Sequence, residues 1–477
     1  MTDIADSGPL EAYLMLTQLQ VQGFKAWRDT GPMRLAPLTV IFGANSSGKS
    51  SLGHLLLALK QTALLADRKR ALHLGNENSL IDLGTFADCI YRHEIGRPLT
   101  FLLRWQLPRT LTVRDALDWQ RNFSGDELEL SSVLTADKAG QPQTTAFTYR
   151  LFDKGEERLR AEHTRTGSAV TLQCIPLDLV HAQGRKWPLE PPEKFYRFAD
   201  RTLSRYQNAD FLAEFALETE RLLQHVFYLG PLRSHPKRVY QWSGDTPPDV
   251  GAQGEYAIAA LLAATEDGRK LNRGRRQKLY GFSAFIAAWL KDLGVINKVS
   301  IKPVAKGRKE YEVLIRTHPG APEVKLTDVG FGISQVLPAL VQAFYAPCDS
   351  VIWMEQPEIH LHPMVQANLA DAFISAVQAY EGGKPRHVQL IIESHSEHLL
   401  TRLQRRVAEG VISPADLAIY FVNRRSSGAE IEPLHLNDYG EIDNWPENFF
   451  GDEMADIAAR TMAAMQRRAA QRQGGGE

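Results

Sequence analysis

The segment Ile41–Ser51, which reads IFGANSSGKSS, has the residue types and the spacing of a phosphate-binding loop. Residues 43–50 satisfy the pattern G-x-x-x-x-G-K-[S/T], in which a glycine-rich loop leads into a helix. Glycines lack a Cβ and let the backbone wrap around phosphate oxygens, while free N–H groups at the helix N-terminus attract anions. We expect these residues to bind the phosphates: Gly43, Ala44, Asn45, Ser46, Ser47, Gly48, Lys49, Ser50 and Ser51.

Two side chains of this loop are expected to have separate tasks. The Lys49 ammonium reaches the β- and γ-phosphates as a mobile point charge, and the Ser50 hydroxyl is a ligand of Mg²⁺. The loop therefore predicts a nucleoside triphosphate site, and we expect ATP and Mg²⁺ as the cofactors.

The residues around the loop supply the elements that position it. Leu38–Phe42 is a short apolar run with several β-branched residues, which predicts a buried strand. Residues 51–60 place four leucines at helical spacing and predict a helix. The alternative is a chance Gly/Ser turn before a helix, and the order of strand, glycine loop and helix disfavours it.

Two further apolar strands are predicted to end in residues that can do chemistry. Val351–Met354 is followed by Glu355, and Gln389–Ile392 is followed by Glu393 and, two residues later, by His395. Since the carboxyl ends of parallel strands meet at one edge of a sheet, Glu355 would position Mg²⁺ there and His395 would point at the γ-phosphate. Taken singly, each residue has a plainer explanation, because buried strands often end in polar residues and most histidines are structural.

Apolar strands that alternate with helices predict an α/β fold with a parallel, doubly wound core, as in P-loop NTPases. Strand-like segments at 101–107, 144–152 and 169–175, separated by polar turns, predict an antiparallel β lobe. Residues 197–226 and 255–293 are strongly helical. We therefore expect an N-terminal half of the core with the β lobe (1–195), a helical insertion lobe (196–295) and a C-terminal half of the core (296–477).

Composition excludes several classes of protein. The 477 residues are 44% hydrophobic and 23% charged, as in ordinary globular proteins, and a net charge of -1 leaves nucleic-acid contact to a local patch. Cys89, Cys174 and Cys348 form no metal-ligand pattern and are typical of reduced thiols in a cytoplasmic protein. No apolar run is long enough to span a bilayer, so we expect no membrane contact.

The three motifs together resemble those of ABC/SMC-type ATPase heads. More narrowly, they resemble the stand-alone AAA-type ATPases of prokaryotic defence systems and their OLD-like relatives, over nearly the whole chain. Glu355–Pro363, reading EQPEIHLHP, matches the pattern [DE]-[EQ]-P-E-x-H-L-H-P, and Ser394–Ser396 matches the histidine loop. Leu326–Gln335 is similar to the serine-containing signature of these families.

In such families two heads enclose two ATP molecules, and the signature of one head caps the γ-phosphate held by the other. The resemblance therefore implies a homodimer or a larger homo-oligomer, in which Thr327, Gly330 and Gly332 reach the partner's nucleotide. It also implies a sensor or switch ATPase in antiviral (anti-phage) defence that acts with a separate effector protein.

One position departs from the family pattern. ABC-type heads usually have Asp-Glu where this chain has Glu355 and Gln356, and a neutral Gln can orient water but cannot accept its proton. We therefore expect slow ATP hydrolysis, with Glu358 or Glu393 as the substitute base. The residues that we assign to catalysis are Glu355, Gln356, Glu358 and His395.

The main alternative function is a DNA-repair or recombination clamp that grips DNA when ATP closes the heads. Basic residues cluster at 269–278 and at Arg402, Arg405 and Arg406 and could contact DNA phosphates, although charge runs are more often solvated helix faces. A nuclease of the OLD type would need a metal-binding domain after the head, and no acidic cluster follows Phe421–Arg425.

Two further segments resemble one branch of these ATPases. They are Tyr228–Arg233, reading YLGPLR, and the run Asp438–Pro446 near the C-terminus. Their residue types alone imply no chemistry, so packing is the default interpretation. Phe24 and Trp27 are either core side chains or a stacking surface for an adenine base.

Overall fold

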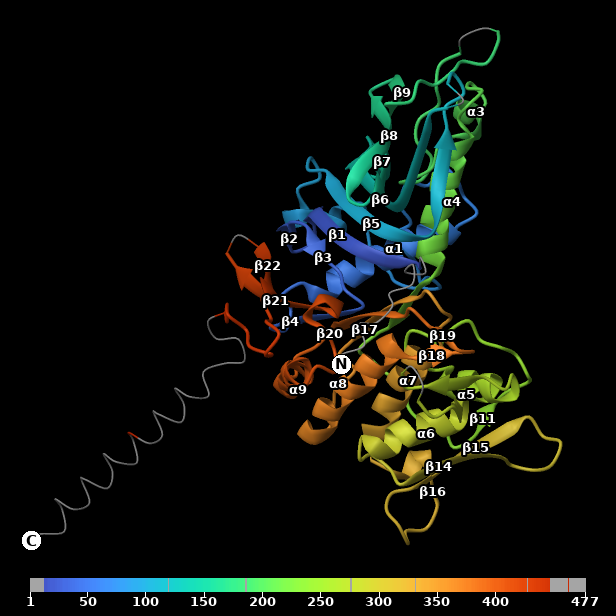
Figure 1. Ribbon diagram of the computed structural model, residues 1–477, viewed down its shortest axis with the longest axis vertical. Helices are drawn as coiled ribbons and strands as arrows, with labels where there is room; N and C mark the ends of the chain where they lie inside the picture. Colours follow the sequence, from blue (N-terminus) through green and yellow to red (C-terminus); the bar gives the residue numbers. More distant parts are fainter. Residues whose placement is uncertain are drawn as a thin grey trace, which may run out of the picture.

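A mixed β-sheet runs through the whole molecule. The computed structural model describes residues 13–446 and 462, except for 119, 185–186, 275–276, 331 and 427, and within these residues the sheet has 14 strands. Five parallel strands form one end of this sheet (Figure 1). In spatial order they are β10 (Val226–Leu229), β17 (Val351–Glu355), β20 (Gln389–Glu393), β4 (Leu38–Gly43) and β21 (Leu417–Arg425).

The strand order brings distant segments to one edge. β20 lies between β4 and β17, although it follows both in the sequence. The register pairs Ile41 with Glu393 and pairs Glu393 with Glu355. The carboxyl ends of β4, β17 and β20 therefore meet, and we refer to this place as the carboxyl edge.

The parallel strands are buried on both faces because apolar residues fill successive positions. In β17, Val351 and Trp353 join one core cluster, while Ile352 and Met354 join the other. This alternation follows from the twofold repeat of a strand. A sheet with an apolar cluster on each face needs helices on both sides.

Helices cover both faces of the sheet. The apolar side chains of α1 and α4 belong to the cluster of Trp353, and those of α5 to α9 belong to the opposite cluster. The helices are α1 (Lys49–Leu64), α2 (Phe86–Cys89), α3 (Asp200–Leu203), α4 (Asp210–Gln224), α5 (Ala257–Glu266), α6 (Phe282–Asp292), α7 (Gly332–Tyr345), α8 (Pro363–Gln378) and α9 (Glu397–Ala408).

Beyond β21 the sheet continues into an antiparallel lobe, which extends upwards in Figure 1. Three of its strands contain the predicted segments, whereas β6 and β8 were not predicted. β6 contains Gly125-Asp126, a pair typical of a turn, and β8 is mostly charged. The strands are β22 (Gly428–Leu434), β2 (Trp27–Asp29), β1 (Met15–Phe24), β3 (Met33–Arg34), β5 (Leu99–Arg114), β6 (Asn122–Ala136), β7 (Pro142–Asp153), β8 (Glu156–Thr166) and β9 (Ala169–Ile175).

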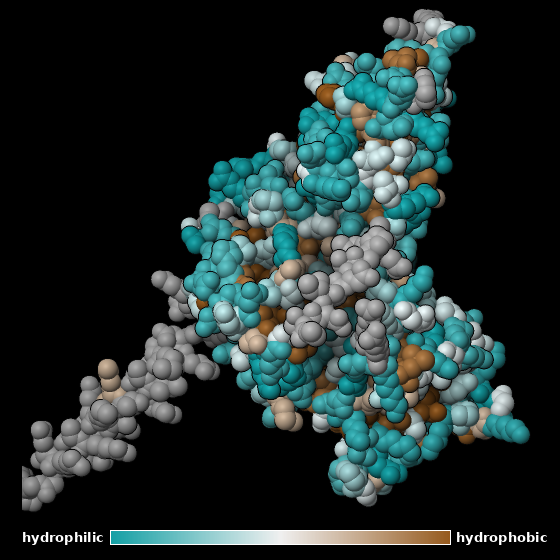
Figure 2. Space-filling model, in the orientation of Figure 1, coloured by the Kyte–Doolittle hydropathy of each residue, from teal (hydrophilic) through white to brown (hydrophobic). Residues whose placement is uncertain are grey.

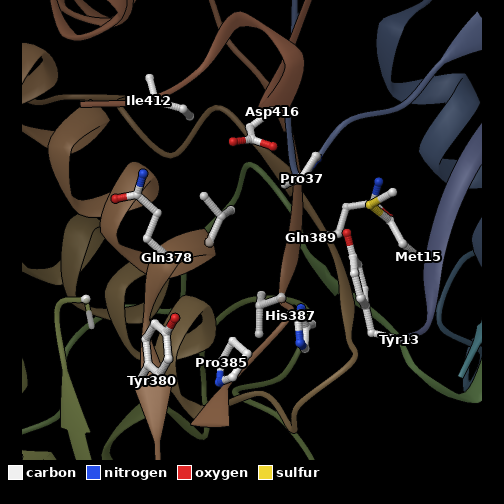
Figure 3. Close-up of a pocket in the computed structure, with 13 residues that line it drawn as sticks. Tyr13, Met15, Pro37, Gln378, Tyr380, Pro385, His387, Gln389, Ile412 and Asp416 are labelled. Carbon is white, nitrogen blue, oxygen red and sulfur yellow. The ribbon is translucent and has the colours of Figure 1, made fainter. Parts of the chain in front are cut away.

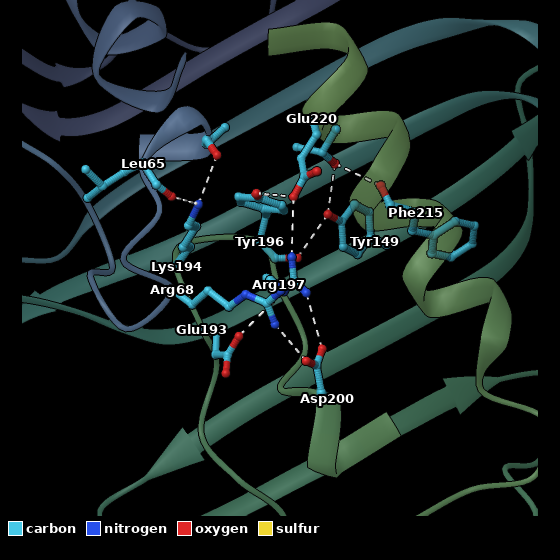
Figure 4. A network of polar contacts seen from close by, with 12 residues as sticks. Leu65, Arg68, Tyr149, Glu193, Lys194, Tyr196, Arg197, Asp200, Phe215 and Glu220 are labelled. Atoms are coloured by element: carbon cyan, nitrogen blue, oxygen red, sulfur yellow. Dashed lines mark hydrogen bonds and ion pairs between the residues drawn. The ribbon is translucent and has the colours of Figure 1, made fainter. Parts of the chain in front are cut away.

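The loop before α3 carries a polar network that joins the lobe to the helices (Figure 4). Arg197 forms an ion pair with Glu220 of α4 (3.6 Å), and the Tyr196 hydroxyl donates to the same carboxylate (2.6 Å). The Lys194 ammonium donates to the carbonyl oxygen of Leu65 (2.8 Å), at the end of α1. This loop therefore fixes α4 to the helix that follows the phosphate loop.

Residues 196–295, predicted as one helical lobe, divide between the two apolar clusters. α4 and β10 pack with the main sheet and α1, whereas α5 and α6 pack with α7. The division into 1–195, 196–295 and 296–477 stays a prediction. Two small sheets lie apart from the main sheet: one has β11 (Tyr240–Gln241), β14 (Lys298–Pro303), β15 (Glu310–Arg316) and β16 (Val324–Lys325), and the other has β12 (Lys270–Asn272), β13 (Tyr280–Gly281), β18 (Tyr380–Glu381) and β19 (Lys384–Pro385).

The predicted α/β class is confirmed, with a parallel core, an antiparallel β lobe and added helices. Phe24 and Trp27 are fully buried, so they are core side chains and no stacking surface. Trp27 donates its indole N–H to the Gly48 carbonyl (3.1 Å) and to the Ser51 hydroxyl (2.8 Å), which supports the phosphate loop from inside.

The surface in view is mostly hydrophilic, with small separate hydrophobic patches (Figure 2). Over the described part of the chain, no helix has both the length and the apolar character that crossing a membrane requires.

Candidate nucleotide site

The phosphate loop links β4 to α1 in the conformation that its glycines predict. Gly43 has φ 147° and Gly48, the N-cap of α1, has φ 108°. A Cβ on Gly43 would lie 2.4 Å from the Val422 carbonyl oxygen, so only glycine fits this position. Residues 44–46 are exposed, which leaves their backbone open to a ligand.

Lys49 lies within this loop and faces three carboxylates. Its ammonium donates to the carbonyl oxygens of Gly43 and Ala44 (2.8 Å each). Burial lowers the pKa of Lys49, and negative charge on Glu393, Glu358 and Glu355 opposes this shift. The charge that the sequence assigns to phosphate binding therefore lies beside the acidic strand ends.

Ser50 contacts Glu393, a residue that the sequence did not place among the metal ligands. The Ser50 hydroxyl donates to Glu393 Oε2 (2.8 Å), and the indole N–H of Trp353 donates to Oε1 (2.7 Å). Burial raises the pKa of Glu393 to about 8, and the negative charge of Glu355 adds to this shift. Glu393 therefore holds a proton at neutral pH.

Glu355 stays ionised beside it. Burial favours the neutral form of Glu355, but hydrogen bonds from His54 and Tyr228 outweigh burial and keep its pKa below the ordinary value. The Tyr228 hydroxyl lies 2.7 Å and His54 Nε2 lies 3.4 Å from Glu355 Oε1. Two adjacent carboxylates thus take different protonation states, as like charges at short range require.

Glu358 and His395 form the next part of the site. Glu358 Oε1 accepts from the Ser394 hydroxyl (2.7 Å) and from the His395 backbone N–H (2.8 Å). Burial raises the pKa of Glu358, and it lowers the pKa of His395 to about 4, so the imidazole is neutral at pH 7. Among the described residues, Glu358 Oε2 and His395 Nε2 are buried without a hydrogen-bond partner.

Gln356 and the signature segment Leu326–Gln335 are the other predicted parts of the site. The Gln356 backbone N–H donates to the Glu393 carbonyl (2.9 Å), and its φ of 45° turns the chain away from β17. Gly330 is exposed, and no atom lies within 4 Å of a Cβ built on it. Thr327 donates to Asp328 (3.1 Å), and Gly332 borders Leu361, whereas residue 331 lies outside the described residues.

Three side chains at the carboxyl edge were not predicted from the sequence. They are His54, which follows Ser50 by one helical turn, and Tyr228 and Arg233 of the YLGPLR segment. Arg233 Nη2 donates to the Glu355 carbonyl (3.2 Å), and burial lowers the pKa of Arg233 to about 10, which leaves it a cation at neutral pH. The sequence did contain one signal for the YLGPLR segment: the apolar run Val226–Leu229 before Gly230-Pro231 is typical of a strand, and this strand ends at the carboxyl edge.

The donor set suits Mg²⁺ and a triphosphate. Mg²⁺ prefers oxygen ligands and is usually held by one or two carboxylates together with substrate phosphates. Ser50, Glu355 and Glu393 offer such oxygens next to Lys49. Among the described residues, no group of three or more His, Cys, Asp or Glu side chains is placed to hold a metal ion.

A cavity of about 400 Å³ lies at the opposite edge of the sheet (Figure 3). Its lining includes Pro37, Gln389 and Asp416, which precede or begin β4, β20 and β21, and Tyr13 stacks on His387 there (centroids 4.1 Å apart). None of the predicted site residues lines this cavity. Ligands of parallel sheets bind at the carboxyl ends of strands, so this cavity is separate from the nucleotide site.

The basic clusters that are candidates for DNA contact are largely engaged within the chain. Arg402 and Arg406 bind Asp371 of α8 (2.7 and 2.6 Å), and Arg269 binds Glu381 (2.7 Å). Residues 275 and 276 lie outside the described residues. DNA contact stays a prediction.

Comparison with known families ties half of this site to an ATPase domain. Residues 272–400, which include Glu355, Glu358 and His395, match the family described as AAA ATPase domain. Residues 412–459 match a family described as protein of unknown function (DUF3696). No protein of curated function matches the chain significantly. The segment that contributes these three residues is therefore similar to that family.

Solved structures similar to the chain include three SMC head domains. An SMC head domain from Thermotoga maritima has 12% identity, covers 88% of this chain and 99% of its own, and has a TM-score of 0.36. An Smc head bound to the C-winged helix domain of ScpA is 12% identical, and the match covers 89% of this chain and 98% of that head, with a TM-score of 0.40. An Smc head with an extended coiled coil, bound to the C-terminal domain of ScpA derived from Pyrococcus furiosus, is 11% identical. The match covers 89% of this chain and 97% of that head, with a TM-score of 0.42.

Proposed function

We propose that this protein binds Mg²⁺-ATP at the carboxyl edge and hydrolyses it slowly. The observation that carries the proposal is the meeting of Lys49, Glu355 and His395, which come from three distant segments, around one place. Lys49 and the loop N–H groups would hold the phosphates, and Ser50 and Glu355 would hold Mg²⁺. The neutral His395 would donate to, or accept from, a group at the γ-phosphate position.

Slow hydrolysis is supported by the state of the acidic residues. Gln356 stands where these ATPases usually have the glutamate that polarises water. Burial raises the pKa of Glu393 to about 8, so its carboxyl group is not a ready proton acceptor at neutral pH, and burial also raises the pKa of Glu358. The turnover assay below decides whether Gln356 limits the handling of the attacking water.

The proposal extends to a switch. Gly330 of the signature is exposed and would be available to a second copy, so ATP would join two heads and slow hydrolysis would release them. Together with the motif resemblance, this supports a cytoplasmic homodimer or larger homo-oligomer that acts with a separate effector protein in antiviral defence. A DNA clamp is less supported, because Arg269, Arg402 and Arg406 of the basic clusters form ion pairs within the chain.

Replacement of Lys49 is the direct test. Lys49→Ala removes the cation expected at the β- and γ-phosphates, so we expect Mg²⁺-ATP binding measured by calorimetry to fall at least about tenfold, since hydrogen bonds to charged groups contribute about 1.5–3 kcal/mol. The exposed Lys69→Ala is the matched control. Unchanged ATP affinity in Lys49→Ala would refute the nucleotide site.

A second variant tests the proposal that ATP hydrolysis is slow. Gln356→Glu restores a carboxylate at the water-polarising position, and we expect phosphate release to rise about tenfold or more. Equal or lower turnover would show that Gln356 does not limit the reaction.

A further inference from the structure

Arg233 is a buried cation whose donors are only partly used. Its exposed fraction is 8%, and Nη2 alone is bonded, to the Glu355 carbonyl (3.2 Å). Within the described residues, Nε and Nη1 are buried and have no acceptor. Leaving donors of a buried charged group unpaired is costly, so their retention calls for a ligand or a structural reason.

The backbone fixes the direction of this side chain. After β10, the Gly230 N–H donates to the Ala252 carbonyl and the Ser234 N–H donates to the Gln253 carbonyl (2.8 Å each). The arch between these two bonds exposes 76% of Leu232 and buries Arg233. The guanidinium is therefore held toward the carboxyl edge by the main chain.

The surroundings of Arg233 do not fit a purely structural role. Negative charge on Glu355 and Glu358 acts on Arg233, yet the described residues form no ion pair with it. Glu358 Oε2 and His395 Nε2 are likewise buried without partners. The two unused donors of Arg233 thus lie at the same edge as these unpartnered groups, and charge-assisted hydrogen bonds to an anion would satisfy them.

The strand order indicates which phosphate this would be. The phosphate loop follows β4, whereas Arg233 follows β10, which lies beyond β20 and β17 in the sheet. Adjacent strands lie about 4.8 Å apart, so the two segments approach a ligand from opposite sides. In the proposed site, the inner phosphates would lie against the loop and the terminal phosphate would extend toward β17.

We propose that Arg233 binds the terminal phosphate of the nucleotide through Nε and Nη1 and so makes the site prefer a triphosphate to a diphosphate. The inference rests on the proposed nucleotide site and adds a specificity-determining residue to it. A forked, always charged side chain suits this contact, because guanidinium groups bind phosphate oxygens in pairs.

The test compares two nucleotides on full-length protein. We expect wild type to bind Mg²⁺-AMP-PNP at least about tenfold more tightly than Mg²⁺-ADP. In Arg233→Gln the affinity for AMP-PNP should fall about tenfold, equivalent to about 1.4 kcal/mol, whereas the affinity for ADP should change less than about twofold. The exposed Arg308→Gln serves as the control and should keep both affinities.

Each outcome decides between the two proposals. Equal loss for both nucleotides, or an unchanged preference for AMP-PNP, overturns the role of Arg233 while the nucleotide site stands. If wild type binds neither nucleotide, both proposals fail. If thermal unfolding shows that Arg233→Gln does not fold, the variant Arg233→Lys replaces it, because lysine keeps the positive charge but lacks the forked guanidinium. We expect Arg233→Lys to reduce the preference for AMP-PNP over ADP at least about threefold. An unchanged preference in Arg233→Lys would overturn the proposal.

Discussion

Glu393 ends β20 between the phosphate loop and Glu355, and its two oxygens are held by Ser50 and Trp353. Because its carboxyl group is buried next to the ionised Glu355, it keeps its proton up to a pH of about 8. Binding of Mg²⁺ at Ser50 would compete with that proton, so nucleotide binding and proton release are expected to be linked at this residue.

This protonation makes stability depend on pH. Between pH 4.5, the ordinary pKa of a glutamate, and about 8, the folded chain binds a proton that the unfolded chain has lost. The contribution of Glu393 to the free energy of unfolding therefore falls as pH rises, by up to about 1.4 kcal/mol per pH unit. We expect Glu393→Gln to remove this slope in urea unfolding between pH 5 and 8. The exposed Glu77→Gln should keep the wild-type slope, and parallel slopes in all three proteins would contradict the prediction.

At the scale of elements, α1 must approach β17 closely for Ser50 to reach the acidic strand ends. The contact is made at Gly53, where a Cβ would lie 2.5 Å from the indole ring of Trp353. The same indole donates to Glu393, so the spacing between helix and strand also sets the position of that carboxyl group.

Gly53→Ala tests this spacing. In an exposed helix the change would stabilise the protein by about 1 kcal/mol, but overpacking a buried contact costs about 1–3 kcal/mol. Because the Trp353 ring is buried and must shift, we expect Gly53→Ala to lower the free energy of unfolding in urea and to change the near-ultraviolet circular dichroism of tryptophan. Gly96→Ala, at an open position, is the control. A more stable Gly53→Ala protein would show that the contact is loose.

At the scale of the whole molecule, the proposed site is divided between residues of one chain and the signature of a second copy, in which Gly330 is exposed. Gly330 is exposed and open, so a large side chain there should leave the fold and the nucleotide pocket of its own chain intact. In the proposed dimer, however, the same side chain would enter the nucleotide pocket of the second copy.

Gly330→Arg should therefore separate binding from association. We expect light scattering to show dimers of wild type with Mg²⁺-AMP-PNP and monomers of Gly330→Arg, while both proteins bind the nucleotide with similar affinity. Gly96→Arg, another exposed and open glycine, should dimerise as wild type does. Nucleotide-dependent dimers of Gly330→Arg would refute the proposed arrangement of the two heads.

The local sequence determined the phosphate loop, the strands that end at Glu355 and Glu393, and the α/β class. Glycine spacing and apolar runs act over a few residues, so they can be recognised without knowing what packs against them. β8 was missed because its charged residues hide the twofold repeat.

Only the tertiary structure decided which residues share the carboxyl edge. That β20 lies between β4 and β17 puts Glu393 next to Ser50, and that β10 lies beside β17 brings Tyr228 and Arg233 to Glu355. The pairings of β20 with β4 and of β10 with β17 join segments more than 100 residues apart, and no local pattern encodes them. Burial, which sets the protonation of Glu393 and His395, is likewise a property of the packed molecule.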